Sequence, residues 1–237
     1  MLRSKTARRR SIFAASLVVL CFGFTMARAQ KKDLGAILQP DKGKFSLVLD
    51  GKAIGQEEFE IAPAGAGWLA RGTTTLQTEK GGSKVTGNLT LGPDGSPISY
   101  DWTAQTEKTN GAHILFANGI AKITLEMQGA RPYEQDLTFG APLVAILDNN
   151  LYHQYAVLAR LYDWSKGGVQ QLPVLIPQEL TPGTITLEFT GSASAQGKNY
   201  DGLRVTTTDL EILLRRDTKH KLMRIEVPSA KVSVVRE

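Results

Sequence analysis

The stretch FSLVLDGKAIGQEEFEI, residues 45–61, consists of two alternating segments joined by a glycine-containing turn. In its first half Phe45, Leu47 and Leu49 occupy every second position, and Gln56–Ile61 forms the second half. Alternation with a period of two places apolar side chains on one face of a β-strand. The stretch therefore predicts an antiparallel hairpin with one buried face.

The same alternation recurs along most of the chain. Further strands are predicted at Trp68–Leu76, Val85–Leu91, Ile98–Thr103, Ile114–Ala117, Ala121–Met127, Thr184–Phe189, Val205–Leu214, Leu222–Val227 and Val232–Val235. The Asn118-Gly119 pair between two of these runs is typical of a two-residue hairpin turn. Strands with one apolar face favour an antiparallel sheet that is covered on one side only.

The pattern changes in the middle of the chain. Apolar residues there step by three or four positions, at Leu143, Leu147, Leu151, Tyr155, Leu158 and Tyr162. This spacing predicts a helix from about 149 to 164, capped by Asp148 or Asn149 and ended by the glycines at 167–168.

These elements predict a mainly β fold. Its architecture is a strongly curved antiparallel sheet, or open half-barrel, with one central α-helix packed on the concave face. A closed lipocalin-like barrel with the helix outside is the alternative arrangement.

Residues 1–29 have the three parts of a secretory signal peptide. A basic start is followed by the apolar run Ile12–Phe24 and by Ala27-Arg28-Ala29, which predicts cleavage between Ala29 and Gln30. Thirteen apolar residues are fewer than the roughly 20 that span a bilayer, so no transmembrane span is expected in the mature chain. The predicted location is the periplasm, or the outside of a cell with a single membrane. An uncleaved anchor and a twin-arginine export route are alternatives.

The predicted domain organisation has three parts. After the signal peptide, residues 30–44 form a lead-in, and residues 45–237 form a single β-rich domain. The net charge of +5 comes from the first thirty residues, which hold six basic residues and no acid. The rest of the chain has 22 basic and 23 acidic residues and so is close to neutral. A nucleic-acid partner is therefore not expected.

The sequence predicts no catalytic, cofactor-binding or metal site. Cys21 is the only cysteine and lies in the signal peptide, which excludes a disulfide or a thiolate zinc site in the mature chain. The three histidines lie far apart, and neither H-E-x-x-H nor G-x-S-x-G occurs. His153 is interpreted as a partly exposed residue of the helix's polar face. Glu58 and Glu60 share a strand face, which is typical of a solvated sheet surface and otherwise of a carboxylate pair.

Aromatic side chains on the predicted helix are the candidate lining of a ligand cavity. They are Tyr152, Tyr155 and Tyr162, with Trp164 just beyond. Aromatic rings with polar tips suit a half-wet cavity, and core packing is the alternative interpretation.

Three features resemble uncharacterised exported β-rich families. They are the opening hairpin with Leu47, Gly51 and Gly55, the segments LPVLIP and TITLEFTG after the helix, and the terminal LMRIEVPSAKVSVV. Those families resemble the lipoprotein-carrier (LolA/LolB-like) half-barrel, and the resemblance covers roughly residues 45–235.

The resemblance implies an exported binding or accessory protein of the envelope. Its ligand would be an apolar small molecule, a lipid or a lipidated partner. One alternative is an interaction module with a packed core, which meets an envelope protein through its sheet edges or the 191–200 loop. Another is a hydrolase that uses His153 or glutamates at the sheet mouth.

Overall fold

The computed structural model describes residues 37–78, 81–195 and 197–237. The first eight strands are β1 (Asp41–Leu49), β2 (Lys52–Ala64), β3 (Gly67–Thr78), β4 (Gly81–Leu91), β5 (Pro97–Gln105), β6 (Thr109–Ala117), β7 (Ile120–Met127) and β8 (Tyr133–Thr138). After them come β9 (Ala145–Ile146), the helix α1 (His153–Leu161), β10 (Val169–Ile176), β11 (Thr181–Ala195), β12 (Lys198–Thr206), β13 (Glu211–Asp217), β14 (Leu222–Val227) and β15 (Val232–Arg236). Two 3₁₀ turns, Pro177–Glu179 and Pro228–Ala230, precede β11 and β15.

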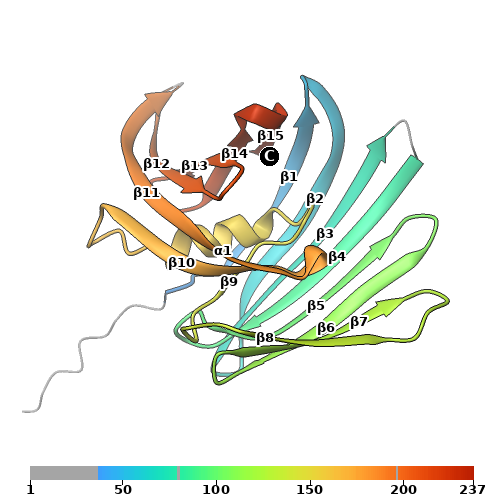
Figure 1. Cartoon of the computed structure of the whole chain (residues 1–237). Helices are drawn as coiled ribbons and strands as arrows, with labels where there is room; N and C mark the ends of the chain where they lie inside the picture. The colour runs from blue at the N-terminus through green and yellow to red at the C-terminus, as the bar shows by residue number, and fades with distance from the viewer. Residues whose placement is uncertain (1–36, 79–80, 196) are drawn as a thin grey trace, which may run out of the picture. The chain divides into compact units, whose positions relative to one another are not determined.

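All fifteen strands belong to one sheet, in the order β8-β7-β6-β5-β4-β3-β2-β1-β15-β14-β13-β12-β11-β10-β9. The pairing of β1 with β15 thus joins two meanders, and among the described strands only β9 and β10 pair in parallel. The order begins at β8 and ends at β9, so the sheet curls without closing (Figure 1). We call the place where the chain passes from β8 to β9 the seam.

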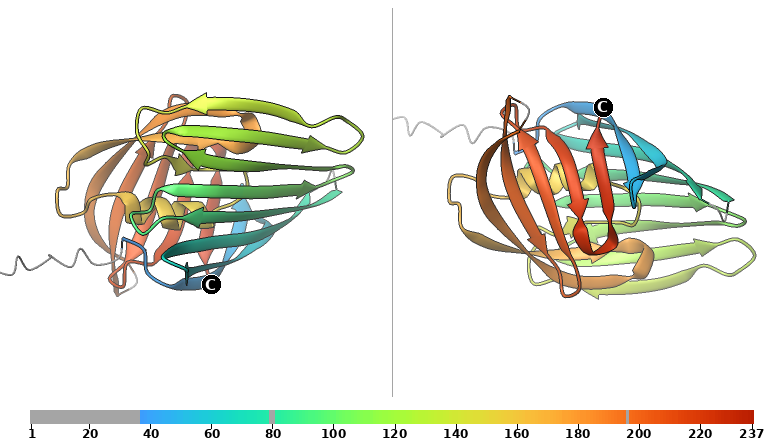
Figure 2. Two further views of the ribbon diagram at one scale, coloured as in Figure 1. Left: turned by 90° about the horizontal axis from the view of Figure 1, so that it is seen from below. Right: turned by 90° about the horizontal axis from the view of Figure 1, so that it is seen from above.

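The helix lies inside the curl of the sheet, between the two meanders (Figures 1 and 2). Six of its nine residues are buried, and it packs against β2, β3 and β14. The curved, open antiparallel sheet with one central helix is therefore confirmed, and the closed barrel with an outer helix is not adopted.

The helix is shorter than its apolar pattern predicts. At the start, Asn150 has a φ of 63°, which is left-handed and incompatible with a helix running from 149. At the end, Tyr162 is extended, with φ −66° and ψ 127°. The apolar spacing therefore continues into the flanking loops, where Leu151 and Tyr162 are buried without being helical.

Several strand limits also differ from the predicted ones. β1 begins at Asp41, inside the predicted lead-in, and the strands β8, β9 and β10 are absent from the prediction. Residues 191–195 and 198–200 belong to the paired strands β11 and β12, where a loop was predicted. Cross-strand pairs of small polar side chains order these strands, including Ser192 with Asp201 at 2.6 Å. The Asn118-Gly119 turn is confirmed, with φ values of 52° and 74°.

Candidate functional site

Two glycines lie side by side on β3 and β4, against the N-terminal end of α1. Gly72 and Gly87 are direct partners in the β3–β4 register. A Cβ atom on Gly72 would lie 2.6 Å from Glu57 Oε1, and one on Gly87 would lie 2.6 Å from Leu151 Cδ1. A side chain at Gly72 would displace Glu57 or His153, and one at Gly87 would displace the Leu151 side chain, since van der Waals contact between such atoms needs about 3.5 Å. The glycine pair therefore fixes where the helix begins to pack.

Glu57 on β2 forms the N-terminal cap of α1, although it is distant in sequence. Glu57 Oε2 accepts hydrogen bonds from the backbone N–H groups of Tyr152 (3.0 Å) and His153 (2.9 Å). Glu57 Oε1 lies 2.7 Å from His153 Nδ1, and both side chains are 0% exposed. The first N–H groups of a helix lack partners within the helix and carry partial positive charge, which suits a carboxylate. The cap thus comes from the sheet, and neither Asp148 nor Asn149 supplies it.

Asp148 organises the loop that leads into the helix. Its carboxylate accepts hydrogen bonds from the Tyr100 hydroxyl (2.8 Å) and from the backbone N–H groups of Asn149 and Gln178 (3.0 Å each). Its own N–H donates to Gln154 Oε1 at 2.5 Å. Burial raises the pKa of Asp148 to about 6, although these hydrogen bonds favour the charged form. Burial, followed by the nearby Asp148 carboxylate, also raises the pKa of Tyr100.

This buried cluster has the groups needed for acid–base chemistry. A histidine oriented by a carboxylate is a common general base. His153 Nε2, Gln154 Nε2, Thr74 Oγ1 and Trp102 Nε1 are buried and have no hydrogen-bond partner among the described residues. However, His153 and Glu57 are completely buried, so a substrate could reach them only if α1 left the sheet. In this conformation the cluster fastens the helix, and the interpretation of His153 as a partly exposed residue is wrong.

The predicted aromatic residues fall into two groups on α1 and its flanks. Tyr152 and Tyr155 are half-buried at the start of the helix, and burial raises the pKa of Tyr155 to about 12. Tyr162 lies ten residues beyond Tyr152, about 15 Å if the chain were helical throughout. The Tyr162 hydroxyl donates to the carbonyl of Gly168 at 2.7 Å. All four aromatic residues thus lie in the hydrophobic core or pack against it, and none of them lines the pocket described below.

Trp164 belongs to a packed aromatic and charged contact with β11 and β13. Its indole N–H donates to the carbonyl of Ala159 at 2.8 Å. Its ring meets Phe189 edge-on at 5.7 Å, and the Arg216 guanidinium lies over it at 3.1 Å from the ring centroid. Asp201 accepts two hydrogen bonds from the same guanidinium. Each polar group here already has a partner within the chain.

The remaining sequence candidates lie elsewhere. Glu60 pairs with Arg71 on the outer sheet face, and this contact lowers the pKa of Glu60. Glu58 beside it is exposed, as a solvated sheet surface requires. No cluster of three His, Cys, Asp or Glu side chains suited to a metal ion occurs among residues 37–78, 81–195 and 197–237. The predicted cleavage residues Ala29 and Gln30 lie outside the described residues.

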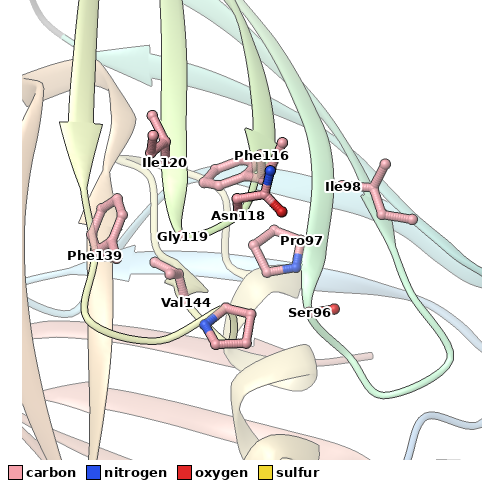
Figure 3. Close-up of a pocket in the computed structure, with 11 residues that line it drawn as sticks. Ser96, Pro97, Ile98, Phe116, Asn118, Gly119, Ile120, Phe139 and Val144 are labelled. Atoms are coloured by element: carbon pink, nitrogen blue, oxygen red, sulfur yellow. The ribbon is translucent and has the colours of Figure 1, made fainter.

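A pocket whose lining side chains are mostly apolar lies beside the seam (Figure 3). Its walls are the start of β5 (96–98), the β6–β7 turn (116–120) and the β8–β9 connection, through Phe139, Pro142 and Val144. We call it the seam pocket. Its volume is about 220 Å³, and only Ser96 and Asn118 bring polar side chains to it.

The size of the seam pocket limits what it can hold. An engineered apolar cavity of about 150 Å³ accepts benzene, whereas pockets for drug-sized ligands span roughly 300–1,000 Å³. The seam pocket, at about 220 Å³, therefore suits one apolar ring, side chain or chain end.

Sequence reasoning missed both Glu57 and the seam pocket, for different reasons. Glu57 has the same parity as the buried residues Phe59 and Ile61 on one strand, so alternation alone could have placed it inside. The seam pocket is built from three segments that are separated in sequence. Their convergence depends on how far the sheet curls, which no local pattern specifies.

Within the described part of the chain, no helix combines the length and the apolar character needed to cross a bilayer.

No family model and no curated protein matches the chain. Among solved structures, the chain is similar to a β-barrel-like protein of the domain of unknown function DUF1849 from Brucella abortus. The TM-score is 0.57 at 10% identity, covering 86% of this chain and 97% of that one. A DUF1089 family protein from Pseudomonas aeruginosa matches with a TM-score of 0.45 at 10% identity, over 81% of this chain and 94% of that one. The chain thus shares a β-barrel-like fold with a domain of unknown function, and at this identity the likeness concerns the fold alone.

Proposed function

We propose that this chain is an exported binding protein of the cell envelope, which holds an apolar group of a ligand or partner in the seam pocket. The observation that carries the proposal is the pocket's lining. Apolar side chains from three separate segments converge beside the open seam, and Ile98 among them is 48% exposed. An apolar group that enters such a hollow removes apolar surface from water on both sides, which favours binding.

The ligand classes are an apolar small molecule, a lipid and a lipidated partner. The resemblance of the sequence pattern to lipoprotein carriers supports the last two. A pocket of about 220 Å³ takes the end of an acyl chain, with the remainder outside.

A packed interaction module is the second candidate function. It is favoured by the filled space around α1, where Leu158, Leu187 and Val205 are at most 1% exposed. Native mass spectrometry of gently purified protein, with organic extraction, separates the two functions. A recurring apolar adduct supports the binding protein, whereas a clean apo mass from several hosts supports the packed module.

Export is part of the proposal and has its own test. The signal peptide predicts a mature chain that starts at Gln30. Intact-mass measurement of the protein from the envelope or culture fraction should give that chain. A full-length mass in the cytoplasmic fraction alone would contradict export.

The pocket is tested with the uncharged fluorescent dye N-phenyl-1-naphthylamine, whose phenyl ring is the group that the pocket can take. We expect saturable binding to the wild-type protein and at least about tenfold weaker binding to Ile98→Glu, because a carboxylate at the mouth must lose water when the dye enters.

Leu115→Glu is the matched control. Leu115 is also 48% exposed and lies on the neighbouring strand β6, but it does not line the seam pocket. Its affinity for the dye should equal that of the wild type. Equal weakening by both substitutions, or by neither, would overturn the seam pocket as the binding site.

A further inference from the structure

The strand β8 ends the sheet and offers a backbone edge. It pairs with β7 in the register Ile120↔Thr138 to Leu125↔Tyr133, and the order of strands ends there. A strand with a neighbour on one side only leaves the N–H and C=O groups of its other side available for a further strand. Figure 2 shows β8 at the outer edge of the meander formed by β1 to β8.

The outer face of β8 is acidic. Glu134 and Asp136 are both exposed and lie two residues apart, about 7 Å along a strand. Their partners on β7 are Thr124 and Lys122. Neither carboxylate forms an ion pair or a hydrogen bond with any other described residue. The edge therefore presents two free negative charges on one face.

These charges decide which kind of strand fits the edge. If a second copy of β8 paired with it antiparallel, with the acids of both copies on the same face, the three registers centred on Glu134, Gln135 and Asp136 would place an acid opposite an acid. With Gln135 opposite itself, for example, Glu134 would face Asp136 twice. Like charges directly opposite each other destabilise a strand pair, and opposite charges stabilise it. The edge fits a foreign strand with basic residues at every second position.

The seam pocket lies at the end of this edge. Phe139 follows β8 directly, and its N–H continues the ladder by donating to the carbonyl of Gly119 at 2.7 Å. Phe139 is also part of the pocket wall. A strand paired with β8 and extending past Thr138 would therefore bring a side chain to the pocket.

We propose that β8 binds an extended peptide segment of a partner protein as an added strand. Lysine or arginine at alternate positions faces Glu134 and Asp136, and an apolar side chain of the same segment fills the seam pocket. The inference rests on the proposed function, because it uses the pocket as a site for an apolar group. It adds the class of partner and the mode of recognition, which is strand addition to a sheet edge.

The test uses the mature full chain and a synthetic peptide, acetyl-Phe-Thr-Val-Lys-Thr-Lys-Val, labelled with fluorescein at its C-terminus. In the antiparallel register the phenylalanine lies opposite Phe139 and the lysines lie opposite Asp136 and Glu134. We expect saturable binding by fluorescence anisotropy and slower hydrogen exchange at residues 133–138. A peptide with glutamate in place of both lysines should bind at least about tenfold more weakly at low salt.

Charge reversal supplies the decisive variant. The double substitution Glu134→Lys, Asp136→Lys should invert the preference, so that the glutamate peptide binds better than the lysine peptide. The control is Glu58→Lys, Glu107→Lys, which changes the net charge equally at exposed sites away from β8. It should keep the wild-type preference.

The outcomes separate the two proposals. If N-phenyl-1-naphthylamine binds at the pocket but the lysine peptide does not bind, the acids of β8 only protect a bare edge, and the strand-addition proposal is overturned while the pocket stands. Peptide binding that ignores the charge reversal, or protection outside β8, also overturns it. Failure of both the dye and the peptide would overturn the proposed function as well.

Discussion

The N-terminal end of α1 and the seam pocket are opposite kinds of site. At the helix end, charged and polar side chains from β2, β5 and the 148–154 segment are buried and bonded to one another, with Glu57 and His153 at 0% exposure. At the seam, apolar side chains face a hollow, and Ile98 remains 48% exposed. A polar group that is buried and paired is costly to disturb, whereas an apolar surface that is still wet gains by being covered. The first site therefore stabilises the fold, and the second is the site at which we propose binding.

The largest effect is expected for Gly72→Ala. The new methyl group would lie 2.6 Å from Glu57 Oε1 and would press against the His153 ring, so the helix cap must open. Overpacking and loss of a buried pair together should lower the free energy of unfolding by about 3 kcal/mol or more. This corresponds to a melting temperature roughly 10 °C lower.

Gly183→Ala is the control for that substitution. Its new Cβ would meet only Val174 Cγ1, at an ordinary 3.5 Å. Thermal unfolding should show a change within about 0.5 kcal/mol for this variant. Equal stability of the two variants would contradict the close packing of α1 on the glycine pair.

A smaller loss is expected for Glu57→Gln. The glutamine amide has one acceptor oxygen. The Glu57 carboxylate has two, and they bond two backbone N–H groups and the His153 ring. We expect a loss of about 2–3 kcal/mol in urea unfolding, because a buried donor is left unpaired. The neighbouring exposed substitution Glu58→Gln should change stability by less than about 0.5 kcal/mol. If both substitutions proved equally mild, Glu57 would not be the cap.

Asp148 gives the cluster a pH dependence. Its pKa is about 6 in the folded state against an ordinary value of 3.8, so the folded state holds this proton more tightly than the unfolded state. The contribution of this group therefore favours folding most below pH 4, weakens as the pH rises from about 4 to 6, and is constant above that. The expected change is about 2–3 kcal/mol.

The difference in unfolding free energy between the wild type and Asp148→Asn isolates this contribution, because asparagine does not titrate. The difference should change between pH 4 and pH 6 and should be level outside that interval. Parallel curves for the two proteins across the interval would show that Asp148 is not buried in this way.

The smallest effect on stability is expected at the seam pocket. Ile98→Glu and Leu115→Glu replace side chains with the same exposure, so each should change stability by less than about 1 kcal/mol. Only the first should lose binding of N-phenyl-1-naphthylamine. If the denaturant midpoint of Ile98→Glu were much lower than that of the wild type, Ile98 would be part of the core and not of the binding site.

The sequence predicts those parts of the fold that depend on local patterns. Alternation identifies most strands, and the Asn118-Gly119 turn specifies its own hairpin, because both residues tolerate positive φ. It does not reveal β8, whose YEQDLT sequence is mostly exposed and has little apolar alternation. It also conceals β10, because a proline such as Pro173 is typical of a strand end. The structure allows a proline there, since the parallel partner β9 pairs only with Val174 and Leu175.

The candidate sites depend on contacts between distant segments. The strand parity of Glu57 indicates that it points inward, but its partners Tyr152 and His153 lie 95 and 96 residues away. Of the aromatic residues predicted on and just beyond the helix, only Tyr155 lies within α1, and Trp164 contacts Arg216 and Phe189, which no helical period predicts. Only the curl of the sheet brings such residues together.

The most direct measurement is the location of a bound apolar group. The photoreactive probe 3-trifluoromethyl-3-phenyldiazirine is small enough for a cavity of about 220 Å³, and peptide mass spectrometry locates where it inserts. Saturable insertion confined to residues 96–98, 116–120 and 139–144, and competed by N-phenyl-1-naphthylamine, is the expected result. Saturable insertion along α1 or at the inner face of β2, with none at the seam, would contradict the assignment of binding to the seam pocket.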